Sequence, residues 1–264
     1  MITISCKDYV AQEKEKIKAK TKDREYVLHI FQIGDNPASN SYIKGKIKDC
    51  EEVGIKAILH KYPEDDYVDI YTDIYDIDYD MGENDISGGI FLQLPVPKDV
   101  DLNEINDSIS PWSDVDGFKQ DSFHKPCTPS GIMDWLEANN IDLCGKNVCI
   151  IGRSDIVGKP LAKMMTDKNA TVTLCHSKTV NLEDHMKMTD IIVAAVGKAK
   201  FIHDIDLPRR PIIIDVGINR DENGKLCGDV DYDNMLNTCE YITPVPSGVG
   251  LLTRAGILKN ITKY

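Results

Sequence analysis

The sequence predicts an α/β protein with two domains, each built around a parallel sheet. Its 264 residues, of which 42% are hydrophobic, suffice for two buried cores of ordinary size. Short apolar runs alternate with helix-length segments in two series, which a loop-rich stretch at residues 110–130 separates. Because strands that alternate with helices pair in parallel, each series favours a doubly wound sheet.

The first series follows a charged helix near the N-terminus. Strands are expected where Val, Ile, Leu and Phe concentrate between turn residues, and helices where apolar residues recur every three or four positions. The expected strands cover residues 26–33, 55–60 and 89–94, and the expected helices cover about 39–53 and 67–81.

The second series begins with a helix expected over 128–139. Strands are expected at residues 147–152, 171–175, 190–196 and 211–216, with helices starting at 158 and covering 182–188. A last helix, over about 249–259, fits either domain by its pattern alone.

The charge balance excludes several classes of partner. Lys and Arg number 31 against 43 Asp and Glu, a net charge of −12, which works against binding to nucleic acid or an anionic bilayer. The N-terminal residues lack the apolar core of a signal peptide, and the most apolar runs, 191–197 and 211–218, are too short to cross a membrane. We expect a cytoplasmic protein that binds a small molecule.

A metal site is not expected. The eight cysteines show no Cys-x-x-Cys pair or zinc spacing and are interpreted as reduced thiols that fill core gaps. The acidic stretch 64–80 imitates the start of a calcium loop at Asp76, Asp78 and Asp80. The loop would then need Gly and Glu where Met81 and Ser87 stand, so an amphipathic helix with an acidic face is favoured.

A glycine-containing turn follows the first strand of the second series. Gly152 ends that strand, and Gly158 opens a helix whose N-terminus can hold a pyrophosphate. Ser154 stands where the usual dinucleotide-binding pattern has its middle glycine, so an ordinary strand-to-helix turn remains the alternative.

The end of the next strand bears on cofactor choice. NAD-binding folds place an acidic residue there, about 20 residues after the turn, whereas this chain has His176, Ser177 and Lys178. Together with Arg153, this cluster favours a ribose phosphate, and therefore NADP over NAD. A solvated basic loop is the alternative.

Three positions in the first series are candidates for chemistry. Tyr42 and Lys46 stand four residues apart on one helical face, where a ring can stack on a heterocycle and an amine can exchange protons. Gln93 lies at the carboxyl end of an expected parallel strand, the edge at which α/β sheets bind ligands. Asp114 or Asp116 can anchor an aminopyrimidinone edge. A surface lysine beside a tyrosine, a Gln that satisfies backbone groups and simple turn residues are the alternatives.

In this order, the motifs resemble the bifunctional methylenetetrahydrofolate dehydrogenase / methenyltetrahydrofolate cyclohydrolase family from about residue 26 to 258. The likeness is carried by Gly34–Ser39, Tyr42-x-x-x-Lys46, Glu51–Ile55, Gln93–Pro95, Asp114–Phe118, Pro126–Pro129 with Gly131, Gly152–Pro160, Cys175–Thr179, Asp215–Asn219, Gly228–Val230 and Thr243–Pro246.

The resemblance implies an N-terminal α/β catalytic domain over 1–124, a C-terminal Rossmann-type NAD(P)-binding domain over 125–248, and a cleft between them. The helix within 249–264 would return to the first domain, and the protein would be a homodimer. The implied reaction passes a hydride from 5,10-methylenetetrahydrofolate to NADP, and water then converts the methenyl cation to 10-formyltetrahydrofolate, a one-carbon donor for purine biosynthesis.

The resemblance also assigns roles. Lys46 would be the key group of the cyclohydrolase step, with Tyr42 stacked on the pterin, Gln93 positioning the lysine and Asp116 anchoring the pterin ring. Further substrate-binding residues would be Leu94, Pro95, Pro246, Gly248 and Gly250. The cofactor-binding residues would be Gly152, Arg153, Ser154, Val157, Gly158, His176, Ser177, Lys178, Gly197, Gly217, Ile218 and Thr253.

One departure from the family pattern leaves other functions open. Ser247 stands in the Pro246–Thr253 segment where the family has a glycine that lets backbone approach a ligand. A non-catalytic folate- or nucleotide-binding protein is one alternative, and a monofunctional NAD-dependent dehydrogenase is another. The presence of Lys46, Tyr42 and Gln93 argues against the monofunctional enzyme, and the nearly complete set of motifs argues against the binding protein.

Overall fold

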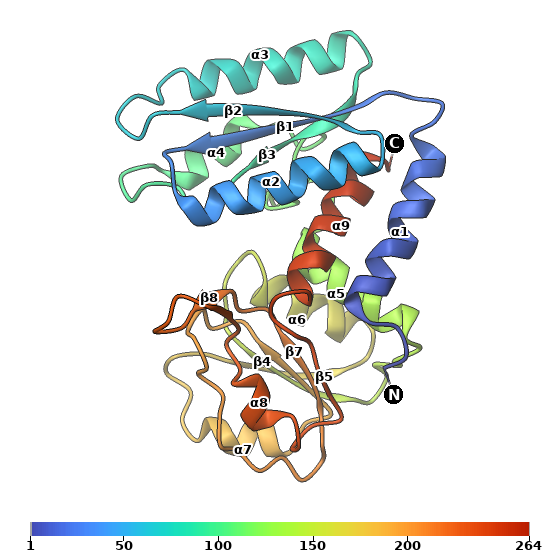
Figure 1. Ribbon diagram of the computed structural model, residues 1–264, viewed down its shortest axis with the longest axis vertical. Helices are drawn as coiled ribbons and strands as arrows, with labels where there is room; N and C mark the ends of the chain where they lie inside the picture. The colour runs from blue at the N-terminus through green and yellow to red at the C-terminus, as the bar shows by residue number, and fades with distance from the viewer. Residues whose placement is uncertain (1, 264) are drawn as a thin grey trace. The chain divides into compact units, whose positions relative to one another are not determined.

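The computed structural model describes residues 2–263 and divides the chain into two units (Figure 1). The first unit comprises Gln12–Cys127 and the residues from Arg254 onward, and the second comprises the residues up to Ala11 and Thr128–Thr253. The expected boundary after residue 124 lies three residues before this division. The N-terminal residues group with the second unit because the amides of Thr3 and Ile4 both donate to Asn139 Oδ1, at 2.8 Å.

The first unit contains a three-stranded parallel sheet in the order β2-β1-β3. Its strands are β1 (Tyr26–Ile33), β2 (Lys56–Tyr62) and β3 (Ser87–Leu92). Its helices are α2 (Pro37–Glu52), α3 (Ile70–Glu83) and α4 (Leu102–Ser108), with parts of α1 (Cys6–Lys20) and α9 (Val249–Ile261).

Both faces of this sheet are covered, because alternate residues of a strand point to opposite sides. Leu28 and Ile30 of β1 pack in a core with Ile43 of α2. Phe31 packs on the other face with Ile74 of α3. Figure 1 shows α2 and α3 on opposite sides of the three strands.

The second unit contains a five-stranded parallel sheet in the order β10-β7-β6-β4-β5. Its strands are β4 (Asn147–Ile151), β5 (Thr171–Cys175), β6 (Ile191–Ala194), β7 (Ile212–Asp215) and β10 (Tyr241–Ile242), with a small hairpin of β8 (Asn219–Arg220) and β9 (Leu226–Cys227). Its helices include α5 (Cys127–Ala138), α6 (Gly158–Asp167), α7 (Leu182–Lys187) and α8 (Tyr232–Met235). The strand order reverses between β4 and β6, and ligands bind beside such reversal points in doubly wound sheets.

The predicted α/β fold with two parallel sheets is confirmed, and the differences are local. Helix α3 begins at Ile70 rather than 67, and α4 has no counterpart among the expected elements because seven residues are too few to establish a period. Asp101 caps α4 by accepting a hydrogen bond from the Asn103 amide at 2.9 Å. In residues 2–263 there is no helix long and apolar enough to span a membrane.

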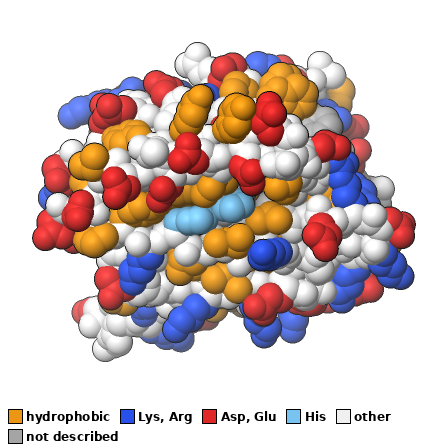
Figure 2. All heavy atoms as spheres, turned by 90° about the horizontal axis from the view of Figure 1, so that it is seen from above, with side chains coloured by type: hydrophobic (Ala, Val, Ile, Leu, Met, Phe, Trp, Pro, Cys, Tyr) orange, Lys and Arg blue, Asp and Glu red, His pale blue; other side chains and the backbone are white. Residues whose placement is uncertain are grey.

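Two histidines adjoin on neighbouring strands of the first unit. His29 Nδ1 and His60 Nε2 are 2.9 Å apart and the rings stack; Figure 2 shows adjoining histidines among hydrophobic side chains. Burial, the adjacent His60 and the charge of Lys56 lower the pKa of His29 to about 4, against the opposing effect of Asp80.

This pKa predicts acid sensitivity. Between pH 6.5 and about 4 the unfolded chain binds a proton at His29 that the folded chain does not, so stability falls as the pH falls through this window. Urea unfolding at about pH 7.5 and about pH 5 measures the loss, and His29→Phe is expected to reduce it. The control His185→Gln alters an exposed histidine and should leave the loss unchanged.

Candidate active site

Helix α2 presents Tyr42 and Lys46 on one face, because residues four apart lie one above the other. The Lys46 side chain is buried, with 6% of the residue exposed. Its Nζ donates a 2.7 Å hydrogen bond to Gln93 Oε1. The same nitrogen lies 4.0 Å from the ring centroid of Phe91 and 6.0 Å from that of Tyr42. The amine nitrogen is therefore held between aromatic rings and one amide oxygen.

Gln93 follows directly after β3, at the carboxyl edge of the sheet. Its backbone N–H donates to the Phe31 carbonyl at 2.8 Å, which continues the strand pairing by one residue. Its side-chain Nε2 donates to the Leu94 carbonyl at 2.5 Å. Because the amide nitrogen is engaged there, the amide oxygen faces Lys46. Leu94 is half-buried, and Pro95, which follows it through a cis peptide bond, is exposed.

The two aspartates of the 114–118 motif have different roles. Asp114 accepts backbone N–H groups from Gly117 at 3.0 Å and Lys119 at 2.9 Å, so it stabilises the turn. Asp116 is buried, and its backbone carbonyl accepts the Cys127 amide at 3.1 Å. Its carboxylate is the strongest charge partner of Lys46. The structure thus favours Asp116 as the functional carboxylate.

Burial brings the pKa values of Lys46 and Asp116 closer together. Burial lowers the pKa of Lys46, and the attraction of Asp116 opposes this. Burial also raises the pKa of Asp116, and the charge of Lys46 opposes that shift. A lysine and a carboxyl whose pKa values approach neutrality can exchange protons at physiological pH.

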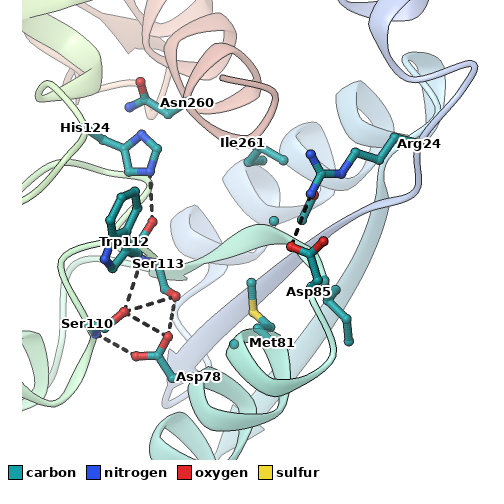
Figure 3. Close-up of a pocket in the computed structure, with 14 residues that line it drawn as sticks. Arg24, Asp78, Met81, Asp85, Ser110, Trp112, Ser113, His124, Asn260 and Ile261 are labelled. Atoms are coloured by element: carbon teal, nitrogen blue, oxygen red, sulfur yellow. Dashed lines mark hydrogen bonds and ion pairs between the residues drawn. The ribbon is translucent and has the colours of Figure 1, made fainter. Parts of the chain in front are cut away.

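Hydrogen bonds to Asp78 of α3 hold the segment before Asp116. Asp78 accepts hydrogen bonds from the Ser110 amide at 2.7 Å, from the Ser110 hydroxyl at 3.0 Å and from the Ser113 hydroxyl. Figure 3 shows these side chains converging at one wall of a cavity of about 300 Å³. The Ser113 carbonyl accepts the Ile90 amide at 2.7 Å, which ties the segment to β3. Asp78, considered above only as a calcium ligand, therefore supports the Asp116 segment.

In the second unit, the turn after β4 is built by close backbone packing. A Cβ on Gly152, whose φ is +127°, would lie 2.0 Å from the Ala195 carbonyl oxygen, and one on Gly158 would lie 2.0 Å from the Gly152 carbonyl oxygen. The Ser154 hydroxyl accepts the amides of Val157 at 3.2 Å and Gly158 at 3.4 Å. Ser154 therefore satisfies two backbone amides in the turn before α6, while Arg153 projects as an exposed side chain.

The turn after β5 lies at the same sheet edge, since β4 and β5 are parallel neighbours. His176 Nδ1 accepts the Lys178 amide at 3.1 Å, and the His176 amide donates to Thr179 Oγ1 at 2.9 Å. Ser177 and Lys178 are exposed. Two cations, Arg153 and Lys178, thus stand on adjacent loops at one edge.

A buried carboxylate within the Gly228–Val230 motif, to which the sequence assigned no role, organises the loop after β6. Asp229 accepts the amides of Val196 at 2.5 Å, Gly197 at 3.0 Å and Lys198 at 2.9 Å. It also accepts a hydrogen bond from Asn219 Nδ2 at 2.9 Å. Gly197 adopts a φ of +72° and borders open space, since a Cβ on this residue would have no atom within 4 Å.

Asp215, at the end of β7, holds Asp229 in turn. Its carboxylate accepts the amides of Gly217, Asp229 and Val230, each at 2.9 Å. Gly217 leaves no room for a side chain, since a Cβ there would lie 2.2 Å from Asp229 Oδ1. The next residue, Ile218, is exposed. The sequence motifs that carry this network are 215–219 and 228–230. Only the folded chain brings the two motifs together.

The remaining candidate residues lie in the second unit, near the start of α9. Pro246 is exposed, Gly248 is buried and Gly250 is half-buried. The hydroxyls of Thr253 and Thr128 are 2.8 Å apart. The structure therefore groups Tyr42, Lys46, Gln93 and Asp116 in the first unit, and these residues in the second.

Ser247 occupies a backbone conformation that favours glycine, with a φ of +81°. Ser247→Gly is expected to raise the free energy of unfolding by about 1 kcal/mol, because left-handed backbone costs other residues about 1–2 kcal/mol. Urea denaturation measures this. Gly224→Ala is the reverse control, since Gly224 has a φ of +75° and open space around it, and it should lose a similar amount.

Comparison with known proteins assigns both parts of the chain. The family model of the tetrahydrofolate dehydrogenase/cyclohydrolase catalytic domain matches residues 3–116, and that of the NAD(P)-binding domain matches 126–264. The bifunctional protein FolD of Bacillus cytotoxicus is 45% identical over 262 residues, covering 95% of this chain and 90% of the relative.

Solved structures agree with this assignment. The bifunctional FolD dehydrogenase/cyclohydrolase of Campylobacter jejuni superposes with a TM-score of 0.90 at 38% identity, covering 98% of this chain and 96% of that one. The FolD enzyme of Trypanosoma brucei, solved with NADP and an inhibitor, gives 0.87 at 26% identity, covering 98% and 95%. The expectation drawn from the motifs is confirmed: the chain belongs to the tetrahydrofolate dehydrogenase/cyclohydrolase family.

Proposed function

We propose that this chain is a bifunctional one-carbon enzyme that acts on tetrahydrofolates. It oxidises 5,10-methylenetetrahydrofolate to the 5,10-methenyl cation with NADP and hydrolyses the cation to 10-formyltetrahydrofolate. The observation that carries the proposal is the buried contact of Lys46 with Gln93 beside Asp116, within the part of the chain that matches the family's catalytic domain.

The residues of the second unit fit NADP. The turn from Gly152 to Val157 and the loop at Gly197 flank the point where the strand order reverses, and open space lies above Gly197. Arg153 and Lys178 supply positive charge for a ribose phosphate. When bound, NADP accepts the hydride. The protein's part in that step is to orient the methylene carbon, whose hydride a neighbouring nitrogen lone pair helps to expel.

Hydrolysis needs a proton acceptor, because water that adds to the methenyl carbon must lose a proton. Neutral Lys46 accepts this proton and returns one to the ring nitrogen that leaves as the C–N bond breaks, so the net products are the formyl compound and one proton. Gln93 fixes the direction of the amine through its 2.7 Å contact. We assign the pterin stacking to Tyr42 and the anchoring of the pterin ring to Asp116.

The NADP preference predicts a selective loss. Arg153→Ala and Lys178→Ala are each expected to raise KM for NADP about tenfold, since a charged contact to phosphate contributes about 1–2 kcal/mol. KM for NAD should stay nearly unchanged, because NAD lacks the ribose phosphate. Initial rates of nicotinamide reduction with each cofactor measure the difference. Equal losses with both cofactors would contradict the role given to these two cations.

The direct test follows reduced nicotinamide and methenyl absorbance separately, with methylenetetrahydrofolate and either NADP or NAD. We expect NADPH to form without lasting methenyl accumulation. Persistent methenyl with NADH would instead identify the monofunctional NAD-dependent dehydrogenase. Folate binding without turnover would identify a binding protein.

The resemblance supports four further proposals. We propose that the enzyme works in the cytoplasm, as a homodimer, and that its product serves purine biosynthesis. We also propose functional domains that follow the expected division at 124/125, with α9 completing the first domain. Sedimentation analysis tests the dimer, since a single species near the monomer mass of 29.6 kDa at micromolar concentration would exclude it.

A further inference from the structure

Arg254 of α9 packs against α2 directly beside the Lys46 site. A Cβ on Gly45 would lie 2.2 Å from Arg254 Nη1 and 3.4 Å from its Cζ. Gly45 lies on α2 between Tyr42 and Lys46. The absence of a side chain at Gly45 thus makes the space that the Arg254 guanidinium fills.

A buried carboxylate fixes the guanidinium in that space. Asp49, one turn along α2 from Gly45, is 4% exposed, and its Oδ2 lies 2.8 Å from Arg254 Nε. The other oxygen, Oδ1, lies 2.7 Å from Nζ of Lys14 on α1. Because Lys14 also pairs with Asp49, loss of Arg254 would not leave this carboxylate uncompensated. Lys14 reaches Glu52 as well, at 2.7 Å.

The titratable groups that face Lys46 come from four parts of the first unit. They are Cys50 on α2, Asp116 on the segment before α5, Cys127 at the start of α5, and Arg254 on α9. Burial lowers the pKa of Lys46 most, and Asp116 and then Cys127 raise it. Arg254, the cation of this set in the described chain, lowers it. Arg254 also lowers the pKa of Tyr42, against the larger effect of burial.

We propose that Arg254 is a positioning residue of the hydrolysis site, a fixed positive charge that favours the neutral, proton-accepting form of Lys46. The inference rests on the proposed function and extends it. Asp116 favours ammonium at Lys46 and so reduces the fraction of the amine that is free to accept a proton. Arg254 opposes that effect without touching the reacting atoms. The packing at Gly45 and the ion pair with Asp49 hold this charge against α2, beside the residue that precedes Lys46 in the chain.

The test is the pH profile of methenyl hydrolysis. Arg254→Met keeps the length of the side chain and removes its charge. The rising limb of kcat is expected to move to higher pH, with a loss of about three- to tenfold at neutral pH, which equals a pKa displacement of about half to one unit. KM should change little. Arg254→Lys, which restores a cation, is expected to return the limb most of the way toward its original position.

A matched control and a second variant test whether the shift of the pH profile is specific to the Arg254 charge. Lys259→Met removes a cation from the same helix, where Lys259 Nζ lies 3.6 Å from Glu13, and should leave the profile unchanged. Gly45→Ala keeps Arg254 but displaces its guanidinium, so it should shift the limb in the same direction even if Arg254→Met does not fold.

Superposable profiles for the wild type, Arg254→Met and Gly45→Ala would overturn the proposal, as would an equal shift in Lys259→Met. The dehydrogenase rate is measured on the same preparations. Two results separate the proposed function from the role of Arg254. Full hydrolysis by a Lys46 variant would end the proposed function itself, whereas an unshifted Arg254→Met profile with hydrolysis still dependent on Lys46 would end only the role of Arg254.

Discussion

Lys46→Ala is expected to abolish methenyl hydrolysis while leaving the dehydrogenase step active. A positioned acid–base group contributes about 10²–10⁴-fold to a rate, and Lys46 is the buried amine of the site. Hydride transfer needs orientation rather than proton transfer, so NADPH should still form. The expected signature is a methenyl species that accumulates as NADPH appears.

A control and a second variant test whether the loss of hydrolysis is specific to the Lys46 amine. Lys44→Ala removes an exposed lysine two residues away on α2 and should leave both activities intact. Gln93→Ala keeps the amine but removes its 2.7 Å partner, so a smaller loss of hydrolysis is expected. Normal hydrolysis by Lys46→Ala would refute the assignment of the lysine.

Asp229→Ala is expected to destabilise the protein more than other single changes in the second unit. The Asp229 carboxylate is fully buried and accepts three backbone amides and the Asn219 amide, so its removal leaves these donors without their partner. The loss should be about 3–5 kcal/mol of unfolding free energy, the range for breaking a buried charged network. Because the loop at Gly197 would lose its anchor, KM for NADP should also rise.

Urea unfolding and NADP titration measure the two effects. Asp233→Ala, an exposed aspartate on α8, is the control and should change the unfolding free energy by less than about 0.5 kcal/mol. Asp229→Asn keeps the shape and one acceptor oxygen, so we expect an intermediate loss. A stability for Asp229→Ala equal to that of Asp233→Ala would show that the loop does not depend on this carboxylate.

Much of the site was predictable because its residues carry local signals. The spacing of Tyr42 and Lys46 places both on one helical face whatever surrounds the helix. Gln93 and the Gly152 turn each follow a buried apolar strand, and the carboxyl edge of a parallel sheet is where such residues meet ligands. The ordered motifs then identified the family without any knowledge of contacts.

The choice between the two aspartates of the 114–118 motif could not be made locally. Both stand in one turn, and only the structure shows that Asp114 accepts the amides of Gly117 and Lys119 while Asp116 is buried beside Lys46. The role of Asp78 was likewise hidden, because its Ser110 partner lies 32 residues away.

The sequence by itself determined the fold class, the family and the candidate residues, because periodicity, turn chemistry and motif order are properties of neighbouring positions. The tertiary structure alone decided which charges act on one another. Lys46 meets Gln93 across 47 positions and Asp229 anchors the Gly197 loop across 32. Arg254 fills the space above Gly45 because two helices distant in the chain pack together. Burial and Coulomb interactions depend on separation in space, so the pKa of Lys46, and with it the proposed chemistry, follows only from the folded chain.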